Sequence, residues 1–187
     1  MSIDALVEDC RAEYQTHLRS VAAAERIKHP EIVTELAIRI NDECWDDRSL
    51  LVRIDMVWGD ASQPVLTNAE LNPIEIRTDE YPSESMVEDV VVKASKFRWH
   101  ACLVRLRPRP ASWSPMWQWF DSWFDLQGLH QPDADGFESV IHGISRAEFE
   151  ADGSCVFTVD FGSAPTVCVM ELVKACGRAG VRELCFS

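Results

Sequence analysis

The spacing of apolar residues changes repeatedly along the chain, and this change limits the possible folds more than any other feature. From Ile3 to Val21 apolar residues recur every three or four positions, which predicts an amphipathic helix ending near Arg26. In LLVRIDMVWG, residues 50–59, the spacing becomes two, as is typical of a β-strand. Helical and strand-like periods then alternate to the C-terminus. We therefore predict an α+β fold.

Further elements are predicted in the first 110 residues. A second helix is expected to begin at Pro30, which suits a first helical turn, and to carry a stripe that includes Val33 and Leu36. A third is expected over residues 83–97, capped near Ser83 or Ser85, although its Val90–Val92 run is β-branched. Residues 65–79 are interpreted as one or two short strands, and residues 98–107 as another.

The second half of the chain begins with a helix signal, Ser114 followed by Pro115, and ends in a strand–helix–strand pattern. Between them, residues 137–161 are interpreted as a β-hairpin that turns at Asp152-Gly153. A helix from Ser163 to Gly180 and a strand over 181–187 follow, and this last strand is expected to run parallel to the strand before the helix. The sequence thus predicts a single α+β domain, residues 1–187. In it, helices pack on a mixed, mostly antiparallel β-sheet, with a C-terminal β-hairpin followed by a helix and a strand.

The charge balance restricts the possible partners. The 187 residues include 31 Asp and Glu but only 18 Lys and Arg, which gives a formal net charge of −13. Such a surface repels phosphate backbones and anionic lipid, so we expect no nucleic-acid and no membrane partner. It attracts basic proteins. The alternative interpretation is that the charge only keeps the protein soluble, as in many acidic bacterial cytosolic proteins.

The cysteines and the N-terminal residues predict a cytoplasmic protein. The segment MSIDALVEDC carries acids where a secretory signal has a basic region and an apolar run. No apolar segment approaches the roughly 20 residues that cross a bilayer. The seven cysteines form no CxxC pair, and most lie within apolar patterns, which is typical of free thiols in a reducing compartment.

No motif for a cofactor, a metal or a nucleophile is recognisable. The glycines form neither GxxxxGK[ST] nor GxGxxG, and there is no GxSxG. The five histidines show no metal-binding spacing, and HQPDADG, residues 130–136, lacks the downstream acid of a calcium loop. His100 and His142 lie within apolar strand patterns, where a histidine is more often a packing residue than a base. We expect no cofactor and no metal.

The segment SPMWQWFDSWFD, residues 114–125, is the most aromatic part of the chain. On a helix its apolar face covers about half the circumference, which is wider than the ~100° stripe of a typical surface helix. Core burial is the first interpretation for Trp117, Phe120 and Phe124. Trp119 and Trp123 lie on the flank, and we expect each of them to contact another element, a second copy or a foreign partner.

Acidic residues gather in clusters along the chain. By contrast, the segment from Val90 to Phe120 contains six Lys and Arg and no acid, and it either neutralises nearby acids or forms a solvated face. An acidic rim around an aromatic centre is typical of many protein interfaces. We therefore choose the candidate partner-binding residues from the aromatic helix and the acidic clusters: Trp119, Trp123, Asp121, Asp79, Glu80, Glu84, Asp46 and Asp47.

Two classes of function follow. The favoured hypothesis is a small acidic cytosolic protein-binding module that neutralises a basic partner, similar in size, acidity and lack of catalytic motifs to the immunity proteins of bacterial toxin systems. The alternative is a small hydrolase-like enzyme with a pocket beside the aromatic helix. This enzyme would use carboxylates and a histidine drawn from Glu70, Glu75, Asp55, His100 and His142. A homodimer without a ligand is a third possibility.

Overall fold

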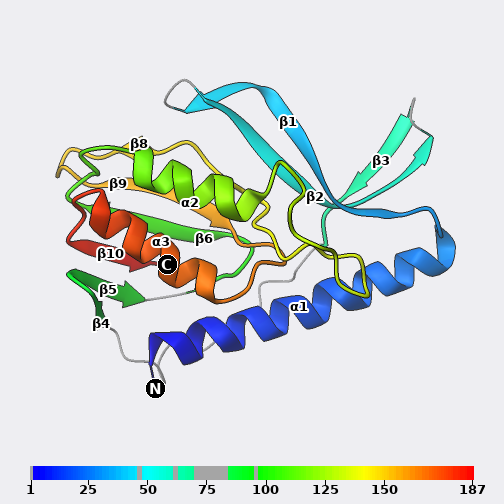
Figure 1. Cartoon of the computed structure of the whole chain (residues 1–187), viewed down its shortest axis with the longest axis horizontal. Helices are drawn as coiled ribbons and strands as arrows, with labels where there is room; N and C mark the ends of the chain where they lie inside the picture. Colours follow the sequence, from blue (N-terminus) through cyan, green and yellow to red (C-terminus); the bar gives the residue numbers. More distant parts are fainter. Residues whose placement is uncertain (1, 46–47, 61–62, 70–83, 95–96) are drawn as a thin grey trace.

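The computed structural model describes residues 2–45, 48–60, 63–69, 84–94 and 97–187, which form three helices and a ten-stranded sheet (Figure 1). The helices are α1 (Ile3–Lys28), α2 (Ser114–Phe124) and α3 (Val167–Arg178). The strands are β1 (Val33–Trp45), β2 (Arg48–Asp60), β3 (Gln63–Thr67), β4 (Glu84–Val87), β5 (Val90–Ala94), β6 (Cys102–Arg107), β7 (Gly143–Ile144), β8 (Glu148–Phe149), β9 (Cys155–Asp160) and β10 (Glu183–Phe186).

The sheet is mixed and mostly antiparallel. Its strand order is β1-β2-β7-β9-β6-β10-β5-β4, with β3 paired to β2 and β8 paired to β9. Only β10 and β5 pair in parallel among the described strands. Because β9 and β10 are both antiparallel to β6, they run parallel to each other, which confirms the prediction for the C-terminal strand. The α+β class is also confirmed.

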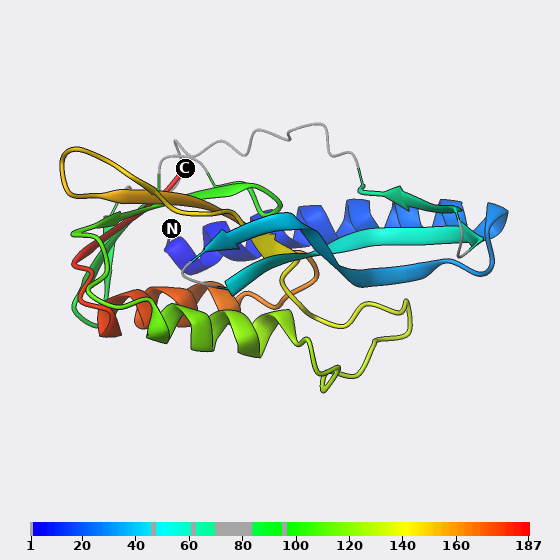
Figure 2. The same cartoon turned by 90° about the horizontal axis from the view of Figure 1, so that it is seen from above.

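The helices cover different parts of the sheet. Figure 2 shows α2 and α3 side by side on one face, where Phe157 and Val159 of β9 are buried. The long helix α1 runs along one side of the molecule toward the β2–β3 hairpin (Figure 1). Its buried stripe includes Leu6, Cys10 and Leu18, as its helical period predicts. None of the described helices combines the length and the apolar character needed to cross a membrane.

Two predicted helices are strands, and both predictions were wrong. The second predicted helix is β1, which pairs antiparallel with β2. The third is the β4–β5 hairpin, whose turn places Glu88 at a φ of 52°. In both segments β-branched residues supply much of the apolar surface, and pairing with a neighbouring strand outweighs the helical spacing.

Other predictions were correct in type but less so in extent. The strand around residues 50–59, the strand within 98–107 and the aromatic helix are present. Of the predicted 137–161 hairpin only β7, β8 and β9 are regular strands, although Gly153 has the expected positive φ of 81°. The last helix begins at Val167 rather than Ser163, because the Ser163 hydroxyl accepts a hydrogen bond from the Val140 amide instead of capping a helix. Most of the predicted 65–79 strand region lies outside the described residues.

The basic segment pairs with acids of the fold, as one of its two interpretations predicted. Lys93 forms an ion pair with Glu183, Arg105 with Glu150, and Arg107 with Asp152. These pairs are partly exposed, so each contributes little stability.

Candidate functional site

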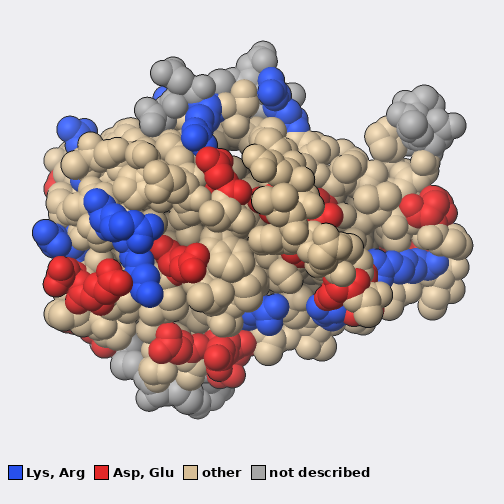
Figure 3. All heavy atoms as spheres, in the orientation of Figure 1, with Lys and Arg blue, Asp and Glu red and all other residues tan. Residues whose placement is uncertain are grey.

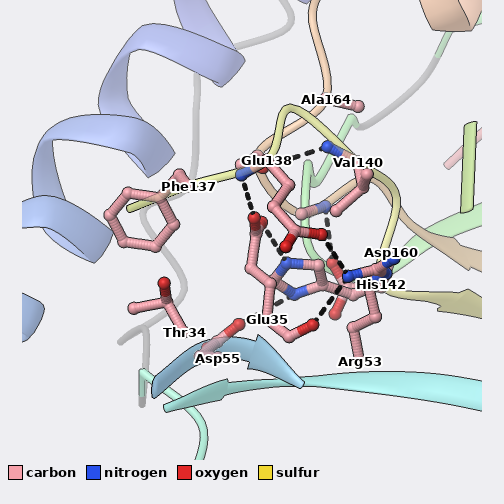
Figure 4. Close-up of polar contacts among 12 residues, drawn as sticks. Thr34, Glu35, Arg53, Asp55, Phe137, Glu138, Val140, His142, Asp160 and Ala164 are labelled. Atoms are coloured by element: carbon pink, nitrogen blue, oxygen red, sulfur yellow. Dashed lines mark hydrogen bonds and ion pairs between the residues drawn. The ribbon is translucent and has the colours of Figure 1, made fainter. Parts of the chain in front are cut away.

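A buried cluster of charged side chains lies where α1, β1, β2 and the segment before β7 meet (Figure 4). Glu35 lies on β1, Arg53 and Asp55 lie on β2, and His142 is the residue that precedes β7. All four belong to the buried polar residues of the protein. Because burying an unpaired charge is costly, a cluster of this kind persists only when its members compensate one another.

His142 lies between two carboxylates. Its Nε2 is 2.8 Å from Oε1 of Glu35 and its Nδ1 is 2.8 Å from Oδ1 of Asp55, and the side chain is 2% exposed. The contact between Nδ1 of His142 and Oδ1 of Asp55 is a close ion pair, but its geometry is not that of a hydrogen bond. Burial alone would lower the pKa of His142, but the two carboxylates and the nearby Asp160 raise it well above the ordinary value of 6.5. The contacts with both carboxylates therefore favour the charged imidazolium form of His142.

The two carboxylates are themselves held by the backbone. The second oxygen of Glu35 accepts a hydrogen bond from the Glu138 amide. Glu35 also has a φ of 55°, a left-handed conformation that is uncommon for residues other than glycine. Asp55 accepts a hydrogen bond from the Ala69 amide through Oδ2, at 2.6 Å. These contacts fix the carboxylates around the imidazolium from separate parts of the chain.

Arg53 ties three segments together. Its guanidinium donates to the carbonyl oxygens of Phe124, Glu35 and Asp125 at 2.8–2.9 Å. It also forms a 2.7 Å ion pair with Glu138. The planar guanidinium can satisfy several acceptors at once, which a lysine at this position cannot do. Arg53 therefore joins β1, the end of α2 and the segment before β7.

The turn after β9 packs directly on the imidazole ring. Gly162 has a φ of 48°, and a Cβ added there would lie 2.0 Å from Cδ2 of His142. The Gly162 carbonyl accepts hydrogen bonds from the Gln15 amide group of α1 at 3.2 Å and from the Trp99 indole at 2.7 Å. Tyr14 of α1 is buried close to Asp55, and burial with the neighbouring acids raises its pKa well above 10. The cluster thus anchors α1 to the sheet.

Asp160 lies at the border of the cluster and lines a hollow of about 380 Å³ over β2, β7 and β9. Its Oδ1 accepts a hydrogen bond from the Gly162 amide at 2.9 Å. Burial, together with the charges of Asp55 and Glu35, raises the pKa of Asp160 to about 6, while the charge of His142 opposes this shift. Unlike Glu35 and Asp55, Asp160 is only half-buried.

This geometry limits what His142 can do chemically. A general base needs a free nitrogen lone pair, whereas both ring nitrogens of His142 face carboxylates. Among the residues that the structure describes, no three His, Cys, Asp or Glu side chains are arranged to hold a metal ion. The closed cluster is therefore suited to stabilise the junction of the segments, and its residues Arg53, His142 and Asp160 border an open hollow.

The residues of the enzyme hypothesis converge in part. Asp55 and His142 lie together, as that hypothesis requires. His100 stacks on Tyr14 with ring centroids 6.1 Å apart, and burial together with the charge of Arg98 lowers its pKa. Glu70 and Glu75 lie outside the described residues.

The aromatic helix is mainly core. Trp117, Phe120 and Phe124 are buried, which confirms their predicted role. Trp119 is 4% exposed and donates its indole N–H to the Cys168 carbonyl of α3, so of its alternatives the structure favours contact with another element. Trp123 is half-buried and donates to Glu171 of α3 at 2.8 Å.

The acidic candidates have different positions. Asp121 is exposed and forms a 2.9 Å ion pair with Arg48 of β2. Glu84 is exposed at the start of the edge strand β4. The other four acidic candidates, Asp46, Asp47, Asp79 and Glu80, lie outside the described residues.

A second hollow, of about 650 Å³, lies beside the C-terminal end of α2 and is lined in part by Asp121. Leu126 and Leu129 on its border are 65% and 71% exposed. The turn that carries them is well ordered by hydrogen bonds, because the Asp125 carboxylate accepts from the amides of Leu129 and His130. Asp125 is in turn held by Arg53 through its carbonyl.

Sequence reasoning did not identify Glu35, Arg53, Glu138 or Asp160 as members of a site. The one local signal was the pair of charges in LLVRIDMVWG, where Arg53 and Asp55 alternate with apolar residues. Comparisons of the chain with protein-family models, with curated proteins and with solved structures found no match.

Proposed function

We propose that the protein is an acidic binding module that docks on a basic protein and neutralises it, in the manner of immunity and inhibitor proteins. The observation that carries this proposal is the charge of the N-terminal half of α1. Asp4, Glu8, Asp9 and Glu13 lie there, and Arg11 is the only Lys or Arg among the first 18 residues. Arg11 is half-buried and donates to the Ala164 carbonyl.

The β4–β5 hairpin adds to this acidic surface. Glu84, Glu88 and Asp89 are exposed on it, and Figure 1 places β4 near the start of α1. In Figure 3 acidic side chains gather over the N-terminal end of α1, whereas acids and bases alternate over α2 and α3. A concentration of one charge sign on one side of a protein speeds the encounter with a partner of the opposite sign.

The contact surface at the end of α2 supplies a second component. Asp121 and half-buried Trp123 belong to α2, and exposed Leu126 and Leu129 border the adjoining hollow. Apolar anchors with a polar surround are typical of protein interfaces. Trp119 is too deeply buried to contribute directly.

The alternative of a small hydrolase-like enzyme has less support. His142 is enclosed by two carboxylates, and the hollow that it lines with Asp160 is over β2, β7 and β9. The hollow beside the aromatic helix is not lined by Asp55, His100 or His142, the described residues that the hypothesis named. A binding function needs no free base and agrees with the exposed acids of α1, Asp4 and Glu8.

The proposal is tested by co-expression with the products of adjacent reading frames, followed by purification at low and at high ionic strength. We expect a basic protein to be retained at low salt and lost at high salt. Failure to retain any protein at either salt concentration would contradict the proposal.

A matched pair of variants then locates the contact. Glu8→Lys with Glu84→Lys reverses two exposed charges of the acidic surface, and we expect the dissociation constant for the partner to rise at least about tenfold. Glu31→Lys with Glu148→Lys makes the same change in net charge at exposed positions elsewhere. The control should leave the dissociation constant within about twofold.

A further inference from the structure

The hollow over β2, β7 and β9 is lined by both apolar and polar residues. Val52 and Ile54 of β2 form an apolar side, and Asn68 and Thr158 contribute polar groups. Asp160 lines the same hollow and is its one acidic residue, and Arg53 and His142 of the buried cluster line it as well. The hollow thus combines an aliphatic surface with a carboxylate.

The charges next to this hollow do not balance. Glu35, Asp55 and Asp160 surround a single imidazolium, that of His142. Arg53 also lines the hollow, but its guanidinium is used by three carbonyl oxygens and by its ion pair with Glu138. Three carboxylates and one cation leave a net negative charge, and Asp160 is the half-buried member of the three.

We propose that this hollow binds the cationic end of an arginine or lysine side chain of the partner, with the aliphatic stem along Val52 and Ile54 and the charge on Asp160. The inference rests on the proposed function for the source of that side chain. Arginine and lysine bury their stems against apolar surface while their charged ends reach a polar group.

The size and chemistry of the hollow favour this occupant. A volume of about 380 Å³ is near the lower end of the ~300–1,000 Å³ range of ligand pockets, so one side chain fits better than a large cofactor. A guanidinium next to a carboxylate also forms charge-assisted hydrogen bonds, which are stronger than neutral ones. Burial, together with the charges of Asp55 and Glu35, raises the pKa of Asp160, and a cation at this position favours its charged form.

The test uses butylguanidinium as a probe and butylurea as its neutral control, each titrated into the ¹⁵N-labelled protein while amide resonances are followed by NMR. We expect butylguanidinium to shift the amides of Asn68, Ser145 and Thr158 with saturation, and butylurea to leave them unchanged. An arginine-containing peptide should shift the same amides, which shows that a side chain within a polypeptide reaches the hollow.

Three variants complete the experiment. Asp160→Asn keeps an oxygen that can accept from the Gly162 amide but loses the charge, and the probe's dissociation constant should rise about tenfold or more. Thr158→Phe fills the hollow and should abolish the saturable shifts. Glu31→Gln removes an exposed carboxylate elsewhere and should leave the dissociation constant within about twofold.

Circular dichroism confirms that each variant is folded before titration. Equal shifts by butylurea, or unchanged affinity in folded Asp160→Asn, would overturn the inference. If the probe binds as expected but no basic protein is ever retained, the hollow is a cation site and the proposed function fails. If a basic partner binds while the probe does not shift these amides, the proposed function stands and this inference fails.

Discussion

The Nε2 atom of His142 lies 2.8 Å from Oε1 of Glu35, a residue 107 positions earlier in the chain, and both side chains are shut off from water. This contact connects β1 to the segment before β7. The contact between Nδ1 of His142 and Asp55 connects the same segment to β2. A charged histidine in this position makes the stability of the fold depend on its two acidic neighbours.

Removing one of these acids should destabilise the protein strongly. In Glu35→Gln the imidazolium loses half of its compensation, and we expect the free energy of unfolding to fall by about 3 kcal/mol, because breaking a buried ion pair leaves an uncompensated charge. Urea denaturation measures this change, and NMR titration should show a lower pKa for His142. In the exposed control Glu31→Gln the free energy of unfolding should change by less than about 0.5 kcal/mol.

Gly162 should not tolerate a side chain. Gly162→Ala places a Cβ 2.0 Å from the His142 ring and strains the backbone at a φ of 48°, so we expect destabilisation by more than about 4 kcal/mol or loss of folding. Gly128→Ala is the matched control, since Gly128 also has a positive φ, 65°, but has open space around it. There only the backbone cost of about 1–2 kcal/mol is expected. Similar thermal stability in the two variants would contradict the proposed packing.

Asp160 should make stability depend on pH between about 4 and 6. Because its pKa is raised to about 6 in the folded protein, the folded state still holds a proton that the unfolded state, with a pKa of 3.8, has released. This contribution is present below pH 4 and is lost as the pH rises through 6, and it amounts to something on the order of 3 kcal/mol.

Asp160→Asn removes this contribution. Urea denaturation of both proteins across that pH range should show the wild type losing stability relative to the variant as the pH rises. The comparison cancels the opposite effect of Asp133 and Asp152, whose pKa values are lowered in both proteins. A constant difference between the two proteins would show that Asp160 titrates normally.

Arg53→Lys should loosen the turn after α2 even though it keeps the charge. An ammonium cannot reach the carbonyls of Phe124, Glu35 and Asp125 together, so we expect a loss of about 3 kcal/mol in unfolding free energy. Hydrogen exchange at the amides of Leu129 and His130, which donate to Asp125, should also become faster. Arg146→Lys at an exposed position should change neither quantity.

How much of the fold was predictable depended on how each segment gains its stability. The stripe of α1 and the aromatic face of α2 are local patterns, and both helices were found. Residues 33–45 have apolar residues at helical spacing, but their conformation is decided by pairing with β2, which no window of sequence contains. In residues 83–97 the Val90–Val92 run is local evidence for a strand. The capping signal near Ser83 or Ser85 favours a helix, and the prediction followed the capping signal.

The site was harder to predict than the fold. Glu35, Asp55 and Asp160 come from β1, β2 and β9, and Glu138 and His142 come from the segment before β7. The proximity of these four segments follows from the sheet order and not from any spacing. Arg53 and Asp55 alternate with apolar residues along their strand, yet both are buried. A charged residue that alternates with apolar ones on a strand can face inward when partners from other strands satisfy it, and those partners are invisible in one segment.

Three of the four acceptors of the Arg53 guanidinium are peptide carbonyls, which every amino acid possesses. The hydrogen bonds of Arg53 therefore depend on the path of the main chain and not on the identity of the side chains around it. Descendants of this protein can replace most of those neighbours and still keep the arginine in place, provided that β1 and the C-terminal end of α2 keep the same positions. Sequence divergence would therefore replace the neighbouring residues long before it changed the fold.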